Sequence, residues 1–176
     1  MIIWITGITA SGKSTLSLML YDELKKLQKI RILRLDGDEL RRKKKFHKGH
    51  DLETRWKNLK IMVEIVKSEM SSYNIIIIST VSHVKEMRDY ARFNLKNFHE
   101  IYLNCSSKIC EGRDFKGLYK KVRNMPSDKQ ELFPGVTVPY QISDNPELVI
   151  DTGLYDIKSS FNKLFSYVEK VRSNLT

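Results

Sequence analysis

The fold of this chain is decided by its opening stretch, Met1-Ile2-Ile3-Trp4-Ile5-Thr6-Gly7-Ile8-Thr9-Ala10-Ser11-Gly12-Lys13-Ser14-Thr15. Its second part has the form G-x-x-x-x-G-K-[ST], the phosphate-binding P-loop, and lies between an apolar run typical of a buried strand and a helical pattern. Gly7 and Gly12 allow a tight turn whose backbone N–H groups point at phosphate oxygens, and the following helix adds the partial positive charge of its N-terminus. We expect Lys13 to reach the β- and γ-phosphates and Ser14 to ligate Mg²⁺.

Beyond this stretch, apolar runs alternate with helical patterns. We expect strands at 2–6, 30–35, 75–78, 99–104 and 148–150, and helices at 13–28, 54–71, 84–96, 107–124 and 155–172. The four-isoleucine run at 75–78 is typical of a central strand buried on both faces. The alternation predicts an α/β fold, a five-stranded parallel sheet flanked by helices and joined by right-handed crossovers. We expect one domain over residues 1–176, with an irregular segment at 125–146 that holds all four prolines.

Composition narrows the class of protein. The chain has 176 residues, 41% hydrophobic and 30% charged, which is ordinary for a soluble globular domain. It has no apolar run long enough for a transmembrane helix and no basic leader before the P-loop strand, so we expect a cytoplasmic protein with no membrane partner. Cys105 and Cys110 are expected to be free thiols. The net charge of +10 implies anionic partners, but nucleotides and nucleic acids both satisfy it.

Two further clusters follow predicted strands, where parallel sheets bind their ligands. Asp36-Gly37-Asp38 offers two carboxylates that suit Mg²⁺ or an acceptor hydroxyl. An aspartate here could also cap the next helix, and both interpretations can hold. The basic segment Arg113–Arg123 could close over a bound nucleotide, exclude water and neutralise a transferring phosphoryl group. Its alternative interpretation is an ordinary basic amphipathic helix.

Together with the P-loop, three stretches resemble the adenylyl-sulfate (APS) kinases: Leu35-Asp36-Gly37-Asp38 followed by Arg41, Cys110-Glu111-Gly112-Arg113-Asp114-Phe115-Lys116-Gly117-Leu118-Tyr119-Lys120-Lys121, and Asn145-Pro146-Glu147-Leu148-Val149-Ile150-Asp151-Thr152. The resemblance spans residues 2–152 in order. It implies a P-loop kinase fold with a basic lid segment at about 112–140, ATP as phosphoryl donor, and Mg²⁺. It also implies transfer to the 3′-hydroxyl of the ribose of a small nucleotide acceptor. No nucleic-acid partner is expected, and a homodimer is left open.

The resemblance also implies roles for individual residues. Asp38 would orient the 3′-hydroxyl, with Lys13 and Ser82 beside it, and Ser82 could instead take the phosphoryl group covalently. Ser14 and Asp36 would hold Mg²⁺. The implied ATP contacts are Gly7, Ile8, Thr9, Ala10, Ser11, Gly12, Lys13, Ser14, Thr15, Arg113, Lys116 and Arg123. The implied acceptor contacts are Asp36, Arg41, His50, Arg55, Asn58, Val81 and Phe133, the last matching a phenylalanine that stacks on the acceptor base.

Departures from the family pattern cluster on the acceptor half. His50 replaces one of two aromatic residues, and Val81-Ser82-His83 stands where the family has Ile-Ser-Pro. His83 could touch an acceptor phosphate or be a plain loop residue. These changes favour a smaller base and a less charged tail, so the preferred acceptor is cytidine diphosphoramidate, which an APS-kinase-like group phosphorylates in capsule modification. APS itself, in sulfate assimilation, is the alternative. A nucleic-acid-binding P-loop protein is more remote, because only the charge of runs such as 41–45 supports it.

Overall fold

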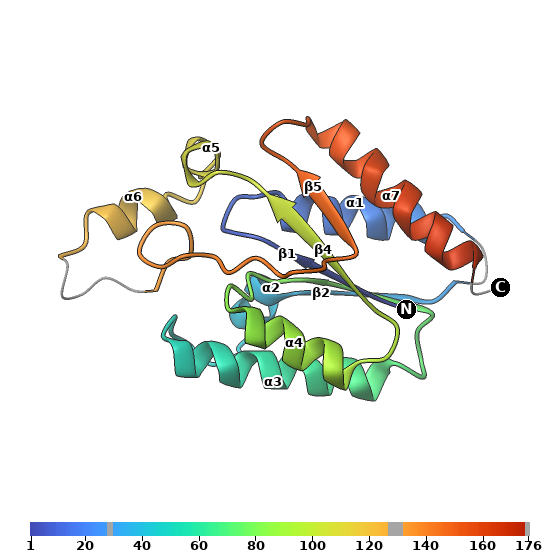
Figure 1. Ribbon diagram of the computed structural model, residues 1–176. Coiled ribbons are helices and arrows are strands. Elements are labelled where there is room, and N and C mark those ends of the chain that lie inside the picture. The colour runs from blue at the N-terminus through green and yellow to red at the C-terminus, as the bar shows by residue number, and fades with distance from the viewer. Residues whose placement is uncertain (28–29, 127–131, 175–176) are drawn as a thin grey trace.

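The computed structural model describes residues 1–27, 30–126 and 132–174. Its centre is one parallel sheet with strand order β2-β3-β1-β4-β5, which confirms the predicted α/β fold (Figure 1). The strands are β1 (Ile2–Thr6), β2 (Ile32–Asp36), β3 (Ile75–Ser79), β4 (Phe98–Asn104) and β5 (Leu148–Asp151). The predicted helix end at residue 28 and residues 127–131 of the predicted lid segment lie outside the described residues.

Helices cover both faces of the sheet. The helices are α1 (Lys13–Lys25), α2 (Gly37–Arg42), α3 (Leu52–Glu69), α4 (Lys85–Asn94), α5 (Ser107–Gly112), α6 (Leu118–Arg123) and α7 (Ile157–Ser173). Figure 1 shows α1 and α7 on one face and α3 and α4 on the other, while α5 and α6 project beyond one end of the sheet. The chain begins at the opposite end, so α5 and α6 lie beyond the carboxyl ends of the strands, where parallel sheets place their ligands.

The strand pattern explains these layers. Successive side chains of a strand point to opposite faces, so Ile2 and Trp4 pack with α3 and α4 while Ile3 and Ile5 pack with α1 and α7. The isoleucines at 75–78 divide in the same way and are all buried. This confirms that β3 is a central strand buried on both faces.

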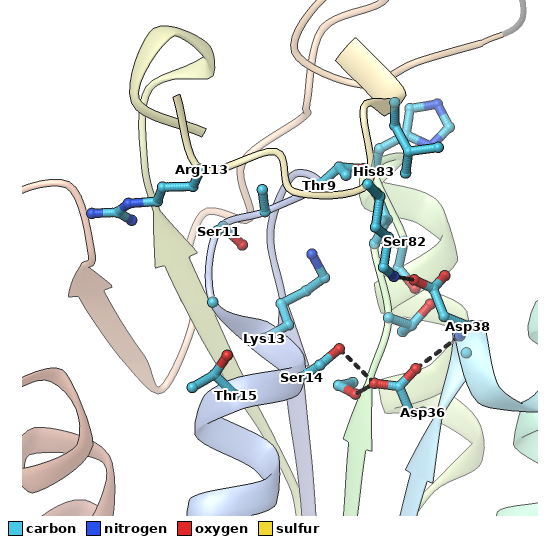
Figure 2. Close-up of a pocket in the computed structure, with 18 of the residues that line it drawn as sticks. Thr9, Ser11, Lys13, Ser14, Thr15, Asp36, Asp38, Ser82, His83 and Arg113 are labelled. Carbon is cyan, nitrogen blue, oxygen red and sulfur yellow. Dashed lines mark hydrogen bonds and ion pairs between the residues drawn. The ribbon is translucent and has the colours of Figure 1, made fainter. Parts of the chain in front are cut away.

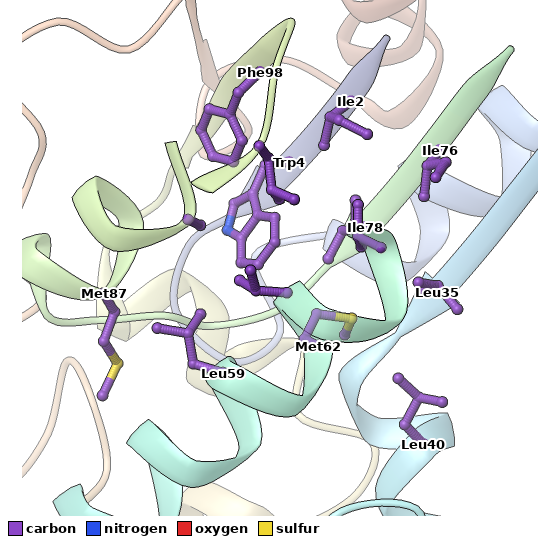
Figure 3. Packing of buried hydrophobic residues seen from close by; sticks show 14 of the residues in the cluster. Ile2, Trp4, Leu35, Leu40, Leu59, Met62, Ile76, Ile78, Met87 and Phe98 are labelled. Atoms are coloured by element: carbon purple, nitrogen blue, oxygen red, sulfur yellow. The ribbon is translucent and has the colours of Figure 1, made fainter. Parts of the chain in front are cut away.

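Trp4 anchors the core on the α3 side (Figure 3). Its ring is fully buried and lies 5.6 Å from the ring of Phe98, measured between centroids. Met62 and Leu59 of α3 belong to the same cluster. This packing fixes α3 against the sheet and thereby places Arg55 and Asn58, which the sequence predicts as acceptor contacts.

The predicted helix over 107–124 is wrong in one respect, because the structure divides it into α5 and α6. Helix α5 ends at Gly112, and α6 begins only after Gly117, the N-cap residue, whose left-handed φ of 66° glycine adopts without strain. The Asp114 carboxylate then accepts a hydrogen bond of 2.6 Å from the Tyr119 amide at the start of α6. The break lets the basic segment turn back over the P-loop instead of running on as one rod.

Cys105 and Cys110 are buried free thiols, as predicted. Both pack with Ile8 and Tyr119 in a small cluster beneath the P-loop. Among residues 1–27, 30–126 and 132–174, no helix combines the length and the apolar character that crossing a bilayer requires.

Candidate active site

A cavity of about 900 Å³ opens at the carboxyl ends of the central strands (Figure 2). It joins the P-loop, the start of α2, the turn after β3, part of the lid segment and the start of α7. Most of the predicted site residues line it: Thr9, Ala10, Ser11, Gly12, Lys13, Ser14, Thr15, Asp36, Asp38, Arg41, His50, Arg55, Asn58, Val81, Ser82, Arg113, Lys116 and Phe133. Gly7, Ile8 and Arg123 are not among the lining residues.

The P-loop is shaped by close backbone approaches. Gly7 has a φ of 149°, and a Cβ atom there would lie 2.7 Å from the carbonyl oxygen of Leu103. Gly12, with a φ of 97°, turns the chain into α1. Gly7 and Ile8 therefore pack on the side of the loop that faces away from the cavity. The backbone N–H groups of the loop and Lys13 are the groups that can bind a phosphate.

Lys13 is held inside the loop. Its Nζ donates a hydrogen bond of 2.6 Å to the Ile8 carbonyl oxygen. Burial lowers the pKa of the Lys13 ammonium to about 8, while the carboxylates of Asp38 and Asp36 partly oppose this shift. A bound polyphosphate would stabilise the charged form of Lys13 and raise this pKa again.

The Asp36 side chain, at the end of β2, is hydrogen-bonded to the P-loop. Its Oδ2 accepts hydrogen bonds of 2.7 Å from the hydroxyls of Ser14 and Ser79, and its Oδ1 accepts the amides of Asp38 and Glu39 at 2.9 and 3.2 Å. It therefore caps α2, as the alternative interpretation of the motif predicted. Burial acts to raise the pKa of Asp36, but these hydrogen bonds outweigh it and hold the pKa below its usual value. With both oxygens engaged, Asp36 has no lone pair left for the predicted contact to the acceptor nucleotide.

The predicted magnesium site has suitable donors. Mg²⁺ prefers oxygen ligands and takes few from the protein when a nucleotide supplies others. The Ser14 side chain is exposed at the cavity, and its hydroxyl donates its proton to Asp36, which leaves its lone pairs available. Ser14 with Asp36 behind it thus fits a hard cation beside the P-loop.

Asp38 faces the cavity and meets the lid segment. Its side chain is 63% exposed, and Oδ2 lies 3.0 Å from the Nζ of Lys116. Asp38 is also the strongest charge that raises the pKa of Lys13, so the carboxylate acts on the phosphate-binding lysine. The Tyr119 hydroxyl donates to the Thr9 carbonyl oxygen at 2.9 Å and ties α6 to the P-loop. These contacts place the start of the lid segment over the cavity.

Arg41 and Asn58 hold the loop between α2 and α3. Arg41 donates to the carbonyl oxygens of His47 and Gly49 at 3.0 and 2.9 Å. The Asn58 amide accepts the His47 N–H at 2.8 Å and donates to the His47 carbonyl oxygen at 3.1 Å. Both residues line the cavity, but in this conformation their polar groups shape the loop.

Arg55 and Phe133 form the far wall of the acceptor side. Arg55 donates to the carbonyl oxygens of His50 and Leu132 at 2.8 and 2.7 Å, which links α3 to the lid segment. The Phe133 ring packs edge-on against Tyr119, with centroids 4.8 Å apart. The structure thus brings together His50, Arg55 and Phe133, which the sequence predicted as acceptor contacts.

Residues 1–151 match the family model described as adenylylsulphate kinase. The chain belongs to this family. An adenylyl-sulfate kinase from Clostridium kluyveri is 37% identical over 168 residues, covering 95% of this chain and 82% of the relative. The structure of the Mycobacterium tuberculosis APS kinase in complex with AMPPNP and APS has a TM-score of 0.83 at 26% identity, covering 96% of each chain. Shikimate kinase from Aquifex aeolicus, at 16% identity and a TM-score of 0.58 over 98% of each chain, shares the fold.

Membership of the adenylylsulphate kinase family confirms the resemblance and the P-loop kinase fold. It makes the chain an ATP-dependent phosphotransferase with an alcohol group as acceptor. The relatives support adenylyl sulfate over cytidine diphosphoramidate, the acceptor that the sequence departures favoured. Nothing in them points to capsule modification.

Two lid arginines of this kinase lie away from the positions predicted for them. Arg113 lines the cavity, but its guanidinium points away from Lys13 and donates to the Thr152 carbonyl oxygen at 2.8 Å (Figure 2). Arg123 lies outside the lining and forms two hydrogen bonds of 2.7 and 2.8 Å with Glu111. The break between α5 and α6 brings Arg123 alongside Glu111. In this conformation the two guanidinium groups are bound to Thr152 and to Glu111.

Some lining residues were not predicted as site residues. The start of α7 and the residues before it contribute Thr152, Tyr155, Asp156, Ile157 and Lys158. His83, for which the sequence left two interpretations, also lines the cavity and is buried. Both groups follow the carboxyl ends of strands, β5 and β3, and this position in the family fold is the signal that could have found them.

Proposed function

We propose that the chain transfers the γ-phosphoryl group of ATP to the ribose 3′-hydroxyl of adenylyl sulfate. The observation that carries the proposal is one cavity that joins Lys13 of the P-loop to the Asp38 carboxylate and to the acceptor-side wall around Phe133. Phosphoryl transfer needs donor and acceptor held in line in a site closed to water. The names of the relatives, which match over most of their length, support adenylyl sulfate as the acceptor.

The donor side binds the polyphosphate. The backbone N–H groups of the P-loop and the Lys13 ammonium hold the β- and γ-phosphates, while the start of α1 adds its positive dipole end. When bound by Ser14 with Asp36 behind it, Mg²⁺ supplies positive charge to the phosphate oxygens. Lys13 is already oriented by its hydrogen bond to the Ile8 carbonyl oxygen, so little reorganisation is needed.

The acceptor side supplies the base. Asp38 accepts a hydrogen bond from the 3′-hydroxyl and takes its proton as the new O–P bond forms and the bond to the leaving ADP breaks. In this conformation Lys116 is paired with the Asp38 carboxylate. Lys116 therefore has to exchange Asp38 for a phosphate oxygen when both substrates are bound, which frees the carboxylate and brings positive charge to the transferring group.

Ser82 is better suited to position the acceptor than to carry the phosphoryl group. It is only 8% exposed and adopts a φ of 37°, so it is held rigidly beside the cavity. A covalent step would leave phosphoserine in protein treated with ATP alone. We expect intact mass spectrometry of such protein to show no added phosphate, and a phosphorylated Ser82 would reverse this assignment.

The acceptor is tested by measuring ADP release with APS and with cytidine diphosphoramidate, and by identifying the phosphorylated product. We expect kcat/KM for APS to be larger by at least about tenfold, the ratio that about 1.4 kcal/mol of differential binding produces. The Asp38→Ala variant should lose turnover with both compounds, which ties the activity to this cavity. A higher kcat/KM for cytidine diphosphoramidate would contradict the proposed acceptor.

A further inference from the structure

His83 carries an unpaired polar atom in the wall of the cavity. The residue is 4% exposed, it lines the cavity, and its Nδ1 is buried without a hydrogen-bond partner among the described residues. Buried polar atoms of folded proteins nearly always have a partner, so such an atom needs a physical explanation. Figure 2 shows His83 on the side of Ser82 and Asp38, opposite Arg113. The His83 side chain therefore lies on the side of the cavity that is predicted to hold the acceptor.

The turn that carries His83 is held firmly. The Ser82 carbonyl oxygen accepts a hydrogen bond from Arg88, and the His83 carbonyl oxygen accepts the Gln141 amide at 2.9 Å. Arg88 is fully buried and is itself held by Glu100 at 2.9 Å. Ser82 keeps its left-handed φ of 37°, a conformation that persists only where the surroundings enforce it. A side chain on such a turn is preorganised, as ligand-contacting groups are.

The electrostatic environment of the His83 imidazole determines which ligand groups it can bind. Burial lowers the pKa of His83 to about 4, and the guanidinium groups of Arg55 and Arg88 act in the same direction. At neutral pH the imidazole is therefore uncharged and offers one N–H donor and one acceptor nitrogen. An uncharged imidazole suits a hydrogen bond with an uncharged polar group of a nucleotide base or ribose better than contact with the anionic tail of the nucleotide.

We propose that His83 is a specificity residue of the acceptor site, where its imidazole forms a hydrogen bond with an uncharged polar group on the base or ribose of the acceptor nucleotide. The assignment rests on the proposed function, because it requires a nucleotide acceptor in this cavity. His50 and Phe133 line the same side of the cavity and supply the rest of the base-contacting surface.

The test compares His83→Leu with His83→Asn, whose side-chain amide keeps a hydrogen-bonding group at this position. His83→Leu should lower kcat/KM for the acceptor by about tenfold, the effect of losing one buried hydrogen bond, while KM for ATP stays within about twofold. His83→Asn should retain most of the activity. The control is His47→Asn, because His47 has an exposed side chain and does not line the cavity. A His83→Leu enzyme that matches the wild type would overturn the assignment.

A second measurement needs no stable variant. The four histidines of the chain can be followed by nitrogen-15 NMR of the wild-type protein, with the His83 signal assigned from a variant or by through-bond experiments. Adding APS without ATP should shift the His83 ring nitrogens while the ring stays uncharged. No shift, or protonation of the ring by the bound tail, would contradict the assignment.

The kinetic comparison is run with APS and with cytidine diphosphoramidate so that two failures can be told apart. A wild-type enzyme that uses only cytidine diphosphoramidate would refute the proposed acceptor, and His83 would then be judged on that compound. A wild-type enzyme that uses APS, together with an unaffected His83→Leu variant, would refute the assignment of His83 and leave the proposed function standing. A wild-type enzyme that turns over neither compound would refute both.

Discussion

The donor and acceptor halves of the cavity are built in different ways. The donor half is one continuous stretch of chain, in which Gly7 and Gly12 shape a loop of backbone N–H groups around a single charged side chain. The acceptor half is assembled from separate segments whose side chains, such as those of Arg41 and Asn58, hold one another's backbone. Backbone recognition tolerates little change in its few required residues, whereas a wall of side chains can be altered one residue at a time.

This difference explains where the chain departs from its family. The P-loop keeps every required residue, because a phosphate offers the same oxygens whatever the acceptor is. The changes at His50 and His83 lie on the acceptor half, where a new side chain alters contacts to the acceptor without disturbing the loop. A departure on that side is therefore weak evidence for a different acceptor, and the relatives carry more weight than the substituted residues.

The largest effect is expected where the two halves meet. Asp38→Ala removes the proposed proton acceptor, and kcat should fall by about 100-fold or more, the scale of losing an acid–base group. Lys13→Ala should have an effect of similar size through lost charge stabilisation. ADP release measures both, with Asp22→Ala on the exposed surface of α1 as the control. A kcat for Asp38→Ala within about threefold of the wild type would remove Asp38 from the chemistry.

Because the donor half is built from backbone, a methyl group added at one of its glycines should destabilise the protein. Gly7→Ala would place a Cβ atom 2.7 Å from the Leu103 carbonyl oxygen at a φ of 149°, so the free energy of unfolding should fall by about 2 kcal/mol. The matched control is Gly112→Ala, where a Cβ atom meets nothing within 4 Å and the change should stay within about 0.5 kcal/mol. Urea unfolding gives both values. Equal stability of the two variants would show that close approach does not shape the loop.

Because the acceptor half is built from side chains, replacing one of them should change KM for the acceptor but not KM for ATP. Asn58→Ala removes both hydrogen bonds to the His47 backbone, and KM for the acceptor should rise by about tenfold or more, because the two bonds together contribute on the order of 1–2 kcal/mol. KM for ATP should stay within about twofold. Asn162→Ala, on the exposed surface of α7, is the control. If both KM values rose together, Asn58 would support the whole cavity and the division into halves would be wrong.

The smallest effect concerns pH and belongs to the donor half. The free enzyme holds Lys13 at a pKa of about 8, so its ammonium is charged below pH 8 and loses its proton above it. Because phosphate binding requires the charged form, the Kd for ATP should rise by about fivefold between pH 8 and pH 9. Calorimetric titration measures it. The Lys13→Arg variant, whose side chain stays charged, should lose this dependence even if it binds more weakly, and an unchanged pH profile would assign the titration to another group.

Much of the fold and half of the site could be predicted from the sequence. The positions of the strands, their parallel direction and the position of the P-loop could be predicted, because they follow from apolar periodicity and from residues that are neighbours in the chain. The prediction of one helix over 107–124 was wrong, because the left-handed conformation of Gly117 and the hydrogen bond from the Tyr119 amide to Asp114 divide the segment. Apolar periodicity alone shows neither feature. The side chains of Arg113 and Arg123 could not be placed, because their partners Thr152 and Glu111 are set by how the segments fold together.

By itself, the sequence determined an α/β P-loop fold and the residues predicted to bind phosphate, because a P-loop needs only local backbone geometry and the lysine within the motif. Only the tertiary structure decided that Asp36 is fully hydrogen-bonded, that Lys116 reaches Asp38, and that the buried Nδ1 of His83 has no partner within residues 1–27, 30–126 and 132–174. These features depend on segments that are distant in the chain and meet at one edge of the sheet. No local pattern encodes which polar atoms find partners there and which do not.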